Sequence, residues 1–449
     1  MSKLIKIEKA LFYFLVFAGF WQMRLVLTLA GRQFNEWTSF YFYATDFIII
    51  AILILWGVRL KSDFKGSPKS DFSRFANIAL FLFLLFSALS LFIAQDKALG
   101  FYRLIKLLEF AGLYFYVRYN FIKLFNWQKL WQCFIAGAVL QSFAAIAQFF
   151  TQKSLGLKFF AESPIGPNID GAAKIVVNGV KIVRAYGLVP HPNILAAILM
   201  IAIFGLVWLW LEKFSTPSFS PPHRERGRWR GWVFLIAILA MALFFTFSRS
   251  VIVVGYISLL GWLIYSWRIR AFRRRIFLIG ILLFIVNCLL LIVFWPYVSS
   301  RYDLAVIGGS QALNLRQFYN QAALDFIKKS PILGIGLGNF VSILAETYNK
   351  LPPWIFQPVH NIYLLIASET GVLGLLAFLA FLFLTVKSAW SRRCDLSVSC
   401  LLFIVCCLLF LGLFDHFLWD LQQGQILFWL VLGLLSAHSS MDRTQASEA

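Results

Sequence analysis

Long apolar segments run through most of this chain of 449 residues and constrain its fold more than any other feature. A helix of about 20 apolar residues crosses a hydrocarbon core about 30 Å thick. We therefore predict an all-α, polytopic integral membrane protein with about 12 transmembrane helices. The predicted spans are residues 10–29, 41–58, 76–94, 101–117, 130–150, 190–211, 231–247, 250–266, 276–296, 361–385, 397–414 and 422–437.

The connections between these spans alternate in basic charge. The short loops on one side hold only Arg32, Lys97 and Arg249. The other side carries clusters of Lys and Arg in residues 3–9, 59–74, 118–129, 213–230, 268–275 and 387–393. Short translocated loops contain few cations, so the basic side is predicted to be cytoplasmic, together with both termini.

Two of the outward connections are long, at about residues 150–189 and 297–360. Both contain aromatic residues, prolines and glycines without a low-complexity run, and long loops of this kind usually carry function. We predict one transmembrane domain over residues 1–437, with the functional site on these extracytoplasmic loops. Residues 438–449 are polar and are predicted to be a disordered tail.

Composition excludes several function classes. The chain is 60% hydrophobic, and its net charge of +21 lies mainly in the predicted cytoplasmic loops. Those cations set orientation and meet anionic membrane lipid, so we do not predict nucleic-acid binding. No cysteine lies in a predicted outer loop, and no spacing of Cys, His or acidic residues suggests a metal.

Within the second long loop, residues 316–330 have helical character, with Asn314 as the predicted N-cap and Pro331 as the stop. Gly334, Gly336 and Gly338 follow. No strand–turn–helix unit surrounds them, so a dinucleotide fingerprint is excluded. We interpret this run as a tight turn that packs closely, against the bilayer surface.

Four motifs lie at the predicted outer face. The first is RAYGLVPHPN, from Arg184 to Asn193, and the second is Ser248-Arg249. The third is Arg316 with its helix and the run SPILGIG from Ser330. The fourth is His360-Asn361-Ile-Tyr, leading to Glu369-Thr-Gly. Over about residues 70–435, their order and placement resemble the O-antigen ligase/polymerase superfamily of bacterial envelope glycan assembly. The last outer turn, with Asp415-His416 and Trp419-Asp420, also fits.

The resemblance implies a glycosyltransferase in the bacterial cytoplasmic (inner) membrane with its active site outside the cytoplasm. The implied donor is a glycan on a polyprenyl diphosphate, typically undecaprenyl diphosphate. The implied acceptor is a hydroxyl of a lipid, a glycan or a protein. Neither a cofactor nor a metal is expected.

The chemistry of this transfer assigns roles to the motif residues. A departing diphosphate gains negative charge, which fixed arginines stabilise, and we assign this role to Arg184, Arg249 and Arg316. An acceptor hydroxyl needs a base, and His360 is the candidate, so His360 and Arg316 are the predicted catalytic residues. Asn193, Asn361 and Glu369 are predicted to support the site.

Simpler interpretations stay open for each of these residues. An interfacial arginine such as Arg249 often only reaches for lipid headgroups, and His360 could only hydrogen-bond a loop carbonyl. Lys106 and Glu109 are three residues apart, which favours an intrahelical pair.

Three functions remain open at this point. They are a ligase, a polymerase that joins repeat units by the same chemistry, and an anion or lipid-linked sugar transporter. A transporter would place polar groups at the bilayer midplane, often in paired halves. The sequence has no obvious internal repeat, and its polar motifs gather at one face, which favours an enzyme.

Overall fold

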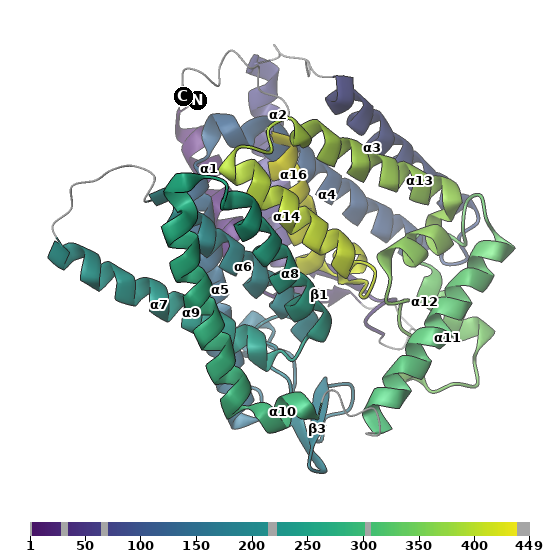
Figure 1. Ribbon diagram of the computed structural model, residues 1–449. Coiled ribbons are helices and arrows are strands. Elements are labelled where there is room, and N and C mark those ends of the chain that lie inside the picture. The colour runs from purple at the N-terminus through teal and green to yellow at the C-terminus, as the bar shows by residue number, and fades with distance from the viewer. Residues whose placement is uncertain (1, 28–34, 64–70, 214–221, 301–306, 438–449) are drawn as a thin grey trace. The chain divides into compact units, whose positions relative to one another are not determined.

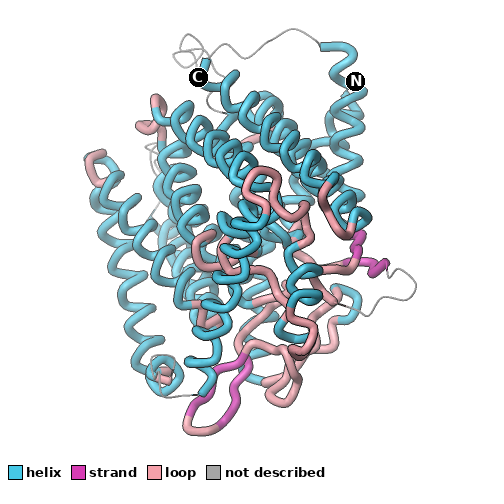
Figure 2. The backbone as a smooth tube through the Cα atoms, turned by 90° about the vertical axis from the view of Figure 1, so that its right-hand side faces the viewer, coloured by secondary structure: helices cyan, strands magenta, loops and turns pink. Residues whose placement is uncertain are grey.

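A computed structural model describes residues 2–27, 35–63, 71–213, 222–300 and 307–437. Most of these residues are helical, and the strands are confined to two short hairpins (Figure 2). The chain divides into two compact units. Unit 1 comprises Met1–Leu15, Met23–Phe125 and Ala312–Ala449, and unit 2 comprises Val16–Gln22 and Asn126–Gln311.

A helix overlaps each of the twelve predicted spans. Among the described residues, six helices are long and apolar enough to cross a membrane, and three further apolar helices are shorter. The six lie at Arg74–Phe92, Trp127–Thr151, Pro192–Glu212, Arg249–Ser266, Arg270–Val293 and Ile362–Trp390. These helices indicate a multi-pass membrane protein. The total of twelve spans, their orientation and the grouping into one domain stay predictions.

Unit 1 contains the ends of the chain that the structure describes. Its elements are α1 (Ser2–Ala18, whose last turn lies in unit 2), β1 (Arg24–Leu27), β2 (Phe40–Tyr43), α2 (Ala44–Asp63), α3 (Asp71–Leu89), η1 (Ser90–Phe92), α4 (Lys97–Leu124), α11 (Ile307–Lys329, mostly in this unit), α12 (Phe340–Thr347), η4 (Pro353–Ile355), α13 (Ile362–Trp390), α14 (Leu396–Leu411), α15 (Phe417–Asp420) and α16 (Gln422–Ala437). In Figure 1, α3 runs along α13, and α4 packs on α16.

The predicted first span, residues 10–29, is wrong at its C-terminal end. Helix α1 stops at Ala18, and residues 24–27 form β1, which pairs antiparallel with β2. Arg24 explains the stop, because its guanidinium forms an ion pair with Glu36 and lies 4.3 Å from the centre of the Tyr41 ring. A charged side chain is costly in the apolar core of a membrane, so the apolar segment ends before the charge that pairs outside the helix.

Several buried charged side chains inside unit 1 form ion pairs. Lys106 Nζ lies 3.0 Å from Glu109, which confirms the intrahelical pair, and 2.6 Å from Asp46 Oδ1 on α2. The buried carboxylate of Glu8 on α1 accepts from Arg59 at 2.8 Å and from Tyr116 at 3.0 Å. An unpaired charge buried among apolar helices is strongly destabilising. These ion pairs therefore hold α1, α2 and α4 together.

A kink in α13 provides the hydrogen-bond acceptors for the glycine run that contains Gly334, Gly336 and Gly338. Gly371 has φ +76° and ψ 175°, which interrupts the helical ladder and leaves nearby carbonyls unbonded. The carbonyls of Ser368 and Glu369 instead accept from Ile335 and Gly336 at 2.8 and 3.0 Å. A Cβ on Gly371 would lie 2.0 Å from the Ile332 carbonyl oxygen, so only glycine allows this approach.

The predicted tight turn is therefore confirmed. Gly334, Gly336 and Gly338 all have positive φ, where glycine is favoured. The predicted packing partner is wrong, because the run packs on protein. A Cβ on Gly336 would meet Ala94 beside η1, and one on Gly338 would meet Arg103 of α4.

The second long loop contains the predicted helix with an earlier start. Helix α11 covers Ile307–Lys329, so Asn314 lies inside it and is not its N-cap. The helix ends two residues before Pro331, as predicted. The predicted disordered tail, residues 438–449, lies outside the described residues.

Unit 2 is built around one buried helix. Its elements are α5 (Trp127–Thr151), η2 (Lys158–Phe160), β3 (Lys174–Val177), β4 (Val180–Val183), α6 (Pro192–Lys213), α7 (Pro222–Phe245), α8 (Arg249–Ser266), η3 (Arg270–Phe272), α9 (Arg273–Val293) and α10 (Trp295–Ser299). Helix α6 is buried along its apolar length and packs on α5, α7 and α8. At Gly205 the α6 backbone lies so close to Trp131 of α5 that a Cβ would be 2.2 Å from its ring. The other long loop, residues 150–189, carries the β3–β4 hairpin.

Candidate functional site

His360 lies in unit 1 at the start of α13, and its position is fixed from both sides. The Asn361 side chain caps the helix by accepting from Tyr363 N at 2.9 Å and Leu364 N at 3.1 Å. The N–H of Ile362 donates to the Gly412 carbonyl at 2.8 Å, and Tyr363 Oη donates to the Leu409 carbonyl at 2.7 Å. These bonds tie the start of α13 to the end of α14 and so bring His360 beside the turn that follows α14.

That turn supplies three more polar residues. His360 Nδ1 lies 3.9 Å from Asp415 Oδ1, which is longer than a hydrogen bond, and the two imidazole rings of His360 and His416 have centres 4.9 Å apart. His416 Nδ1 is bonded to Asp420 Oδ1 at 2.9 Å, one helical turn away. Asp415 Oδ1 accepts from the His416 backbone N–H at 2.8 Å. We call these four residues the histidine–aspartate cluster.

The cluster shifts the pKa values of its two histidines in opposite directions. Burial lowers the pKa of His360; Asp415 opposes this, and the neighbouring positive charges of His416 and Arg316 lower it further. Burial also acts to lower the pKa of His416, but Asp420 and Asp415 outweigh it and the pKa is raised. His360 is therefore disposed to be neutral and His416 to be charged. A neutral imidazole can accept a proton.

Helix α11 covers this cluster. Tyr319 is buried, its ring centre lies 5.9 Å from that of His360, and its hydroxyl donates to the Ile355 carbonyl at 2.6 Å. Burial raises the pKa of Tyr319 to about 12, so it stays a neutral hydroxyl. Arg316 lies on the same helix, is exposed, and acts on both histidines through its charge. The structure thus brings Arg316 and His360 to one region of unit 1.

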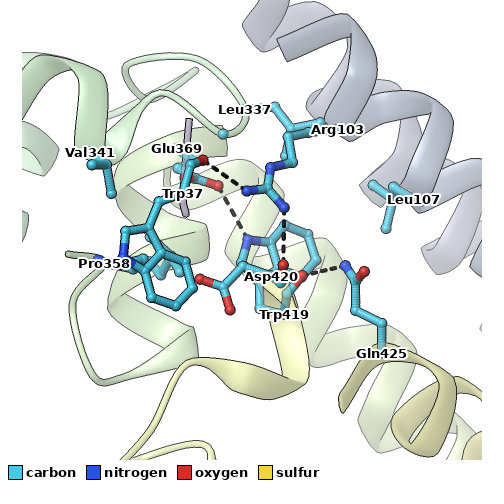
Figure 3. A pocket seen from close by; sticks show the side chains of 12 residues that line it. Trp37, Arg103, Leu107, Leu337, Val341, Pro358, Glu369, Trp419, Asp420 and Gln425 are labelled. Atoms are coloured by element: carbon cyan, nitrogen blue, oxygen red, sulfur yellow. Dashed lines mark hydrogen bonds between the residues drawn. The ribbon is translucent and has the colours of Figure 1, made fainter. Parts of the chain in front are cut away.

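Glu369 belongs to a small polar pocket close to the cluster (Figure 3). Trp419 Nε1 donates to Glu369 Oε2 at 3.2 Å, and Arg103 donates to the backbone carbonyls of Asp420 and Trp37 at 3.0 and 2.9 Å. In Figure 3 the side chains of Arg103 and Glu369 point toward one another. The cavity measures about 30 Å³, which has room for water and is too small for a sugar ring.

Unit 2 carries Arg184, Asn193 and Arg249. Arg184 is buried and donates through Nε to the Thr246 carbonyl at 2.6 Å and through Nη2 to Asn193 Oδ1 at 2.7 Å. Asn193 lies in the first turn of α6, so it holds the guanidinium against the α7–α8 turn. Arg249 begins α8 in that same turn and is exposed. The first two sequence motifs therefore meet within unit 2.

An apolar cavity of about 390 Å³ lies beside Arg249. Its lining is mostly aromatic and aliphatic and comes from α7, α8, α9 and α10, with Tyr256 and Asn287 as its other polar side chains. The residues are Phe244, Phe247, Arg249, Ile252, Val253, Tyr256, Leu283, Phe284, Asn287, Leu291 and Val298. An apolar cavity with one cation in its lining suits an amphiphile with an anionic head.

His360, Asp415 and His416 have the composition of a metal site, with ligand atoms within 4.8 Å of one another. Ligands of one tetrahedral metal lie closer together than this, because each is only about 2.0–2.2 Å from the ion. His416 Nδ1 and Asp415 Oδ1 are also already hydrogen-bonded. We therefore interpret the cluster as an acid–base group, and a chelator experiment tests this below.

The predicted site residues fall into two groups. Arg316, His360, Asn361 and Glu369 belong to unit 1, and Arg184, Asn193 and Arg249 belong to unit 2. No role was assigned to His416, Asp420 or Trp37 in the sequence analysis. The four-residue spacing of His416 and Asp420 is a sequence signal for their pairing, whereas Trp37 is 66 residues from Arg103 and offered none.

Comparison with known proteins agrees with the motifs. No curated protein matches the chain. Residues 232–379, about a third of the chain, match the family model described as O-Antigen ligase. The matched region runs from α7 into α13 and contains Arg249, Arg316, His360, Asn361 and Glu369. Together with the apolar helices, this match confirms the resemblance inferred from the motifs: residues 232–379 of this multi-pass membrane protein are similar to the O-antigen ligase superfamily, whose members are ligase- or polymerase-like membrane enzymes.

Proposed function

We propose that the protein is a glycosyltransferase of the extracytoplasmic membrane face. It moves a glycan from a polyprenyl diphosphate to an acceptor hydroxyl, as a ligase does. The histidine–aspartate cluster is the observation that carries this proposal. In it, His360 is disposed to be neutral and its Nδ1 has no hydrogen-bond partner, whereas His416 is ion-paired with Asp420. The family match supports the reaction class.

In the proposed step the acceptor oxygen forms a bond to the anomeric carbon of the donor sugar. The bond between that carbon and the diphosphate oxygen breaks, and polyprenyl diphosphate leaves with the electron pair. His360 takes the hydroxyl proton of the acceptor. A base positioned in this way contributes about 10²–10⁴-fold to the rate. Diphosphate is a good leaving group, so the step needs no general acid.

We assign the donor to the arginines. A guanidinium offers two parallel N–H donors to phosphate oxygens and keeps its charge at any physiological pH. Arg249 supports this assignment best, since the 390 Å³ apolar cavity beside it suits isoprenoid units while the guanidinium meets the anionic head. Arg184 and Arg316 are proposed as further contacts to the diphosphate. These cations take the role that a divalent metal has in other diphosphate chemistry.

A polymerase would use the same residues, and only its acceptor would differ. In a ligase the acceptor is a terminal lipid, glycan or protein hydroxyl, and in a polymerase it is a second lipid-linked repeat unit. Supplying purified protein with lipid-linked donor alone separates the two. Products of two or more repeat units identify a polymerase, whereas a ligase leaves the donor unchanged until another acceptor is added.

The proposal is tested by transfer from a polyprenyl-diphosphate glycan with purified protein in detergent or nanodiscs. Arg249→Ala is expected to lower transfer by about 10²–10³, the typical effect of one lost contact to a developing anion. Lys153→Ala changes an outer cation outside the proposed site and serves as the matched control. EDTA is expected to leave the rate unchanged. Wild-type transfer by Arg249→Ala would refute the donor assignment, and loss of activity in EDTA would refute the metal-free reaction.

A further inference from the structure

We propose that His416, held as a cation by Asp420, is a positioning residue that keeps the neighbouring His360 imidazole neutral and oriented as the base. This inference rests on the proposed function, because it assigns a second residue to the same transfer. His416 touches no substrate in this scheme and acts only through His360.

The geometry of the pair carries the inference. The His416 side chain is 5% exposed, and that of Asp420 is 9% exposed, so their 2.9 Å contact is shielded from water. Buried ion pairs break at a high cost, which holds the His416 ring in one orientation. The Trp37 ring packs on it in a T-shaped arrangement, with centres 4.9 Å apart and planes at 88°. His416 is thus a fixed group against which His360 packs.

The charges around the two histidines determine which of them carries a proton. Among the described residues, the charged and titratable groups facing the two histidines are Asp415 and Asp420 from the α14–α16 turn and Arg316 and Tyr319 from α11. Tyr319 is neutral and donates away from the pair, to Ile355. Asp415 favours a proton on His360, whereas His416 and Arg316 disfavour it. His416 is the buried member of that opposing set, so its effect is the least screened.

His360 Nδ1 completes the argument. It is buried, has no hydrogen-bond partner, and faces Asp415 at 3.9 Å. A carboxylate at this distance favours a proton on the ring, and burial together with a nearby cation opposes it. His416 provides that cation at a ring-centre distance of 4.9 Å. Without it, His360 would be protonated over more of the working pH range and would then be unable to act as a base.

The test compares the acid limb of the pH–rate profile in two variants. His416→Gln removes the cation, so the acid limb is expected to move to higher pH. The ratio of activity at neutral pH to activity on the acid limb should rise about fourfold or more. This is the effect on the protonation of His360 of one unit charge 4.9 Å away, even at the dielectric constant of water. Asp415→Asn removes the opposing anion, so its acid limb is expected to move to lower pH.

Opposite shifts distinguish positioning by charge from a merely structural role. A structural role predicts lower rates with unmoved limbs in both variants, and that result would overturn the inference. His191→Gln, in unit 2, is the matched control and should leave the limb in place. His416→Lys restores a cation and is expected to return the limb toward that of the wild type even where its rate stays low. Asp420→Asn is nearly isosteric, so it serves if His416→Gln fails to fold, and it should move the limb upward as well.

A direct measurement separates this inference from the proposed function. The chain has only five histidines, so isotope-labelled histidine allows the His360 titration to be followed by NMR in the intact protein without any substrate. An upward shift of that titration in His416→Gln supports the inference even if no transfer is found. An unchanged titration overturns it even if His360→Ala abolishes transfer and thereby supports the proposed function.

Discussion

Replacing His360 by alanine is the sharpest perturbation that the structure suggests. If His360 is the base, the variant loses about 10²–10⁴ in transfer rate. That range corresponds to about 3–5 kcal/mol of transition-state stabilisation, at 1.36 kcal/mol for each factor of ten. The assay is single-turnover transfer from a polyprenyl-diphosphate glycan, with donor binding measured separately on the same preparation.

The structural cost of this substitution is small, which makes the experiment interpretable. The His360 side chain is 24% exposed, and its buried Nδ1 makes no hydrogen bond that the substitution would break. Its ring contacts with Tyr319 and His416 amount to about 0.5–1.5 kcal/mol each at most. The helix start is held by Asn361 rather than by His360, so α13 keeps its cap. A large loss of rate is therefore not expected to come from unfolding.

The pH dependence gives the same hypothesis a second test. Burial and neighbouring cations lower the pKa of His360, so the neutral ring persists below the pH at which a free histidine is protonated. Activity is expected to be constant near neutral pH and to fall only as the pH drops through that lowered pKa. Full transfer by His360→Ala with normal donor binding would refute the base assignment. A wild-type rate that rises on acidification would refute it independently.

Three other predictions concern the donor, the kink and the topology. Arg316→Lys keeps the charge but loses the planar fork, so transfer should fall, and a wild-type rate would show that only charge matters there. Gly371→Ala should destabilise the protein by about 2–4 kcal/mol, because the added Cβ would meet a carbonyl and the residue has a positive φ. Gly57→Ala is the control: a Cβ there would enter open space, so the melting temperature should stay nearly unchanged. Reporters fused after residues 270 and 392 should report cytoplasm and one after residue 165 the outer side, and a swapped signal would remove the basis for an extracytoplasmic site.

Continuous apolar runs made most of the helices predictable. Each apolar run is a local property, so every predicted span overlaps a helix. The ends were less predictable, because they depend on partners elsewhere. Arg24 ends its segment by pairing with Glu36, and α11 starts seven residues before Asn314, the N-cap expected from local preference. A helix start is decided by the whole segment and its packing, and propensity alone is a weak guide.

The candidate site was predictable in its residue types but not in its assembly. Arg184 and Asn193 share one motif, and the structure joins them by a hydrogen bond. His360 was predictable as a base because few other side chains titrate near neutral pH. Its neighbours Asp415 and His416 lie more than 50 residues away, and nothing in their local sequence points to His360. Only the bonds between α13 and α14 place them together.

These bonds also explain why the glycines of this region matter to the chemistry. A Cβ on Gly412 would lie 2.6 Å from the Ile362 side chain, so glycine allows the α14 carbonyl to reach the Ile362 N–H. A Cβ on Gly424 would lie 2.0 Å from the Phe417 carbonyl oxygen, so glycine there lets α15 fold back on α16. The first contact sets where His360 stands, and the second sets where the His416–Asp420 pair stands. The distance between the two histidines, on which the proposed neutrality of the base depends, is therefore held by two close approaches, of which the one at Gly424 leaves no room for a side chain larger than hydrogen.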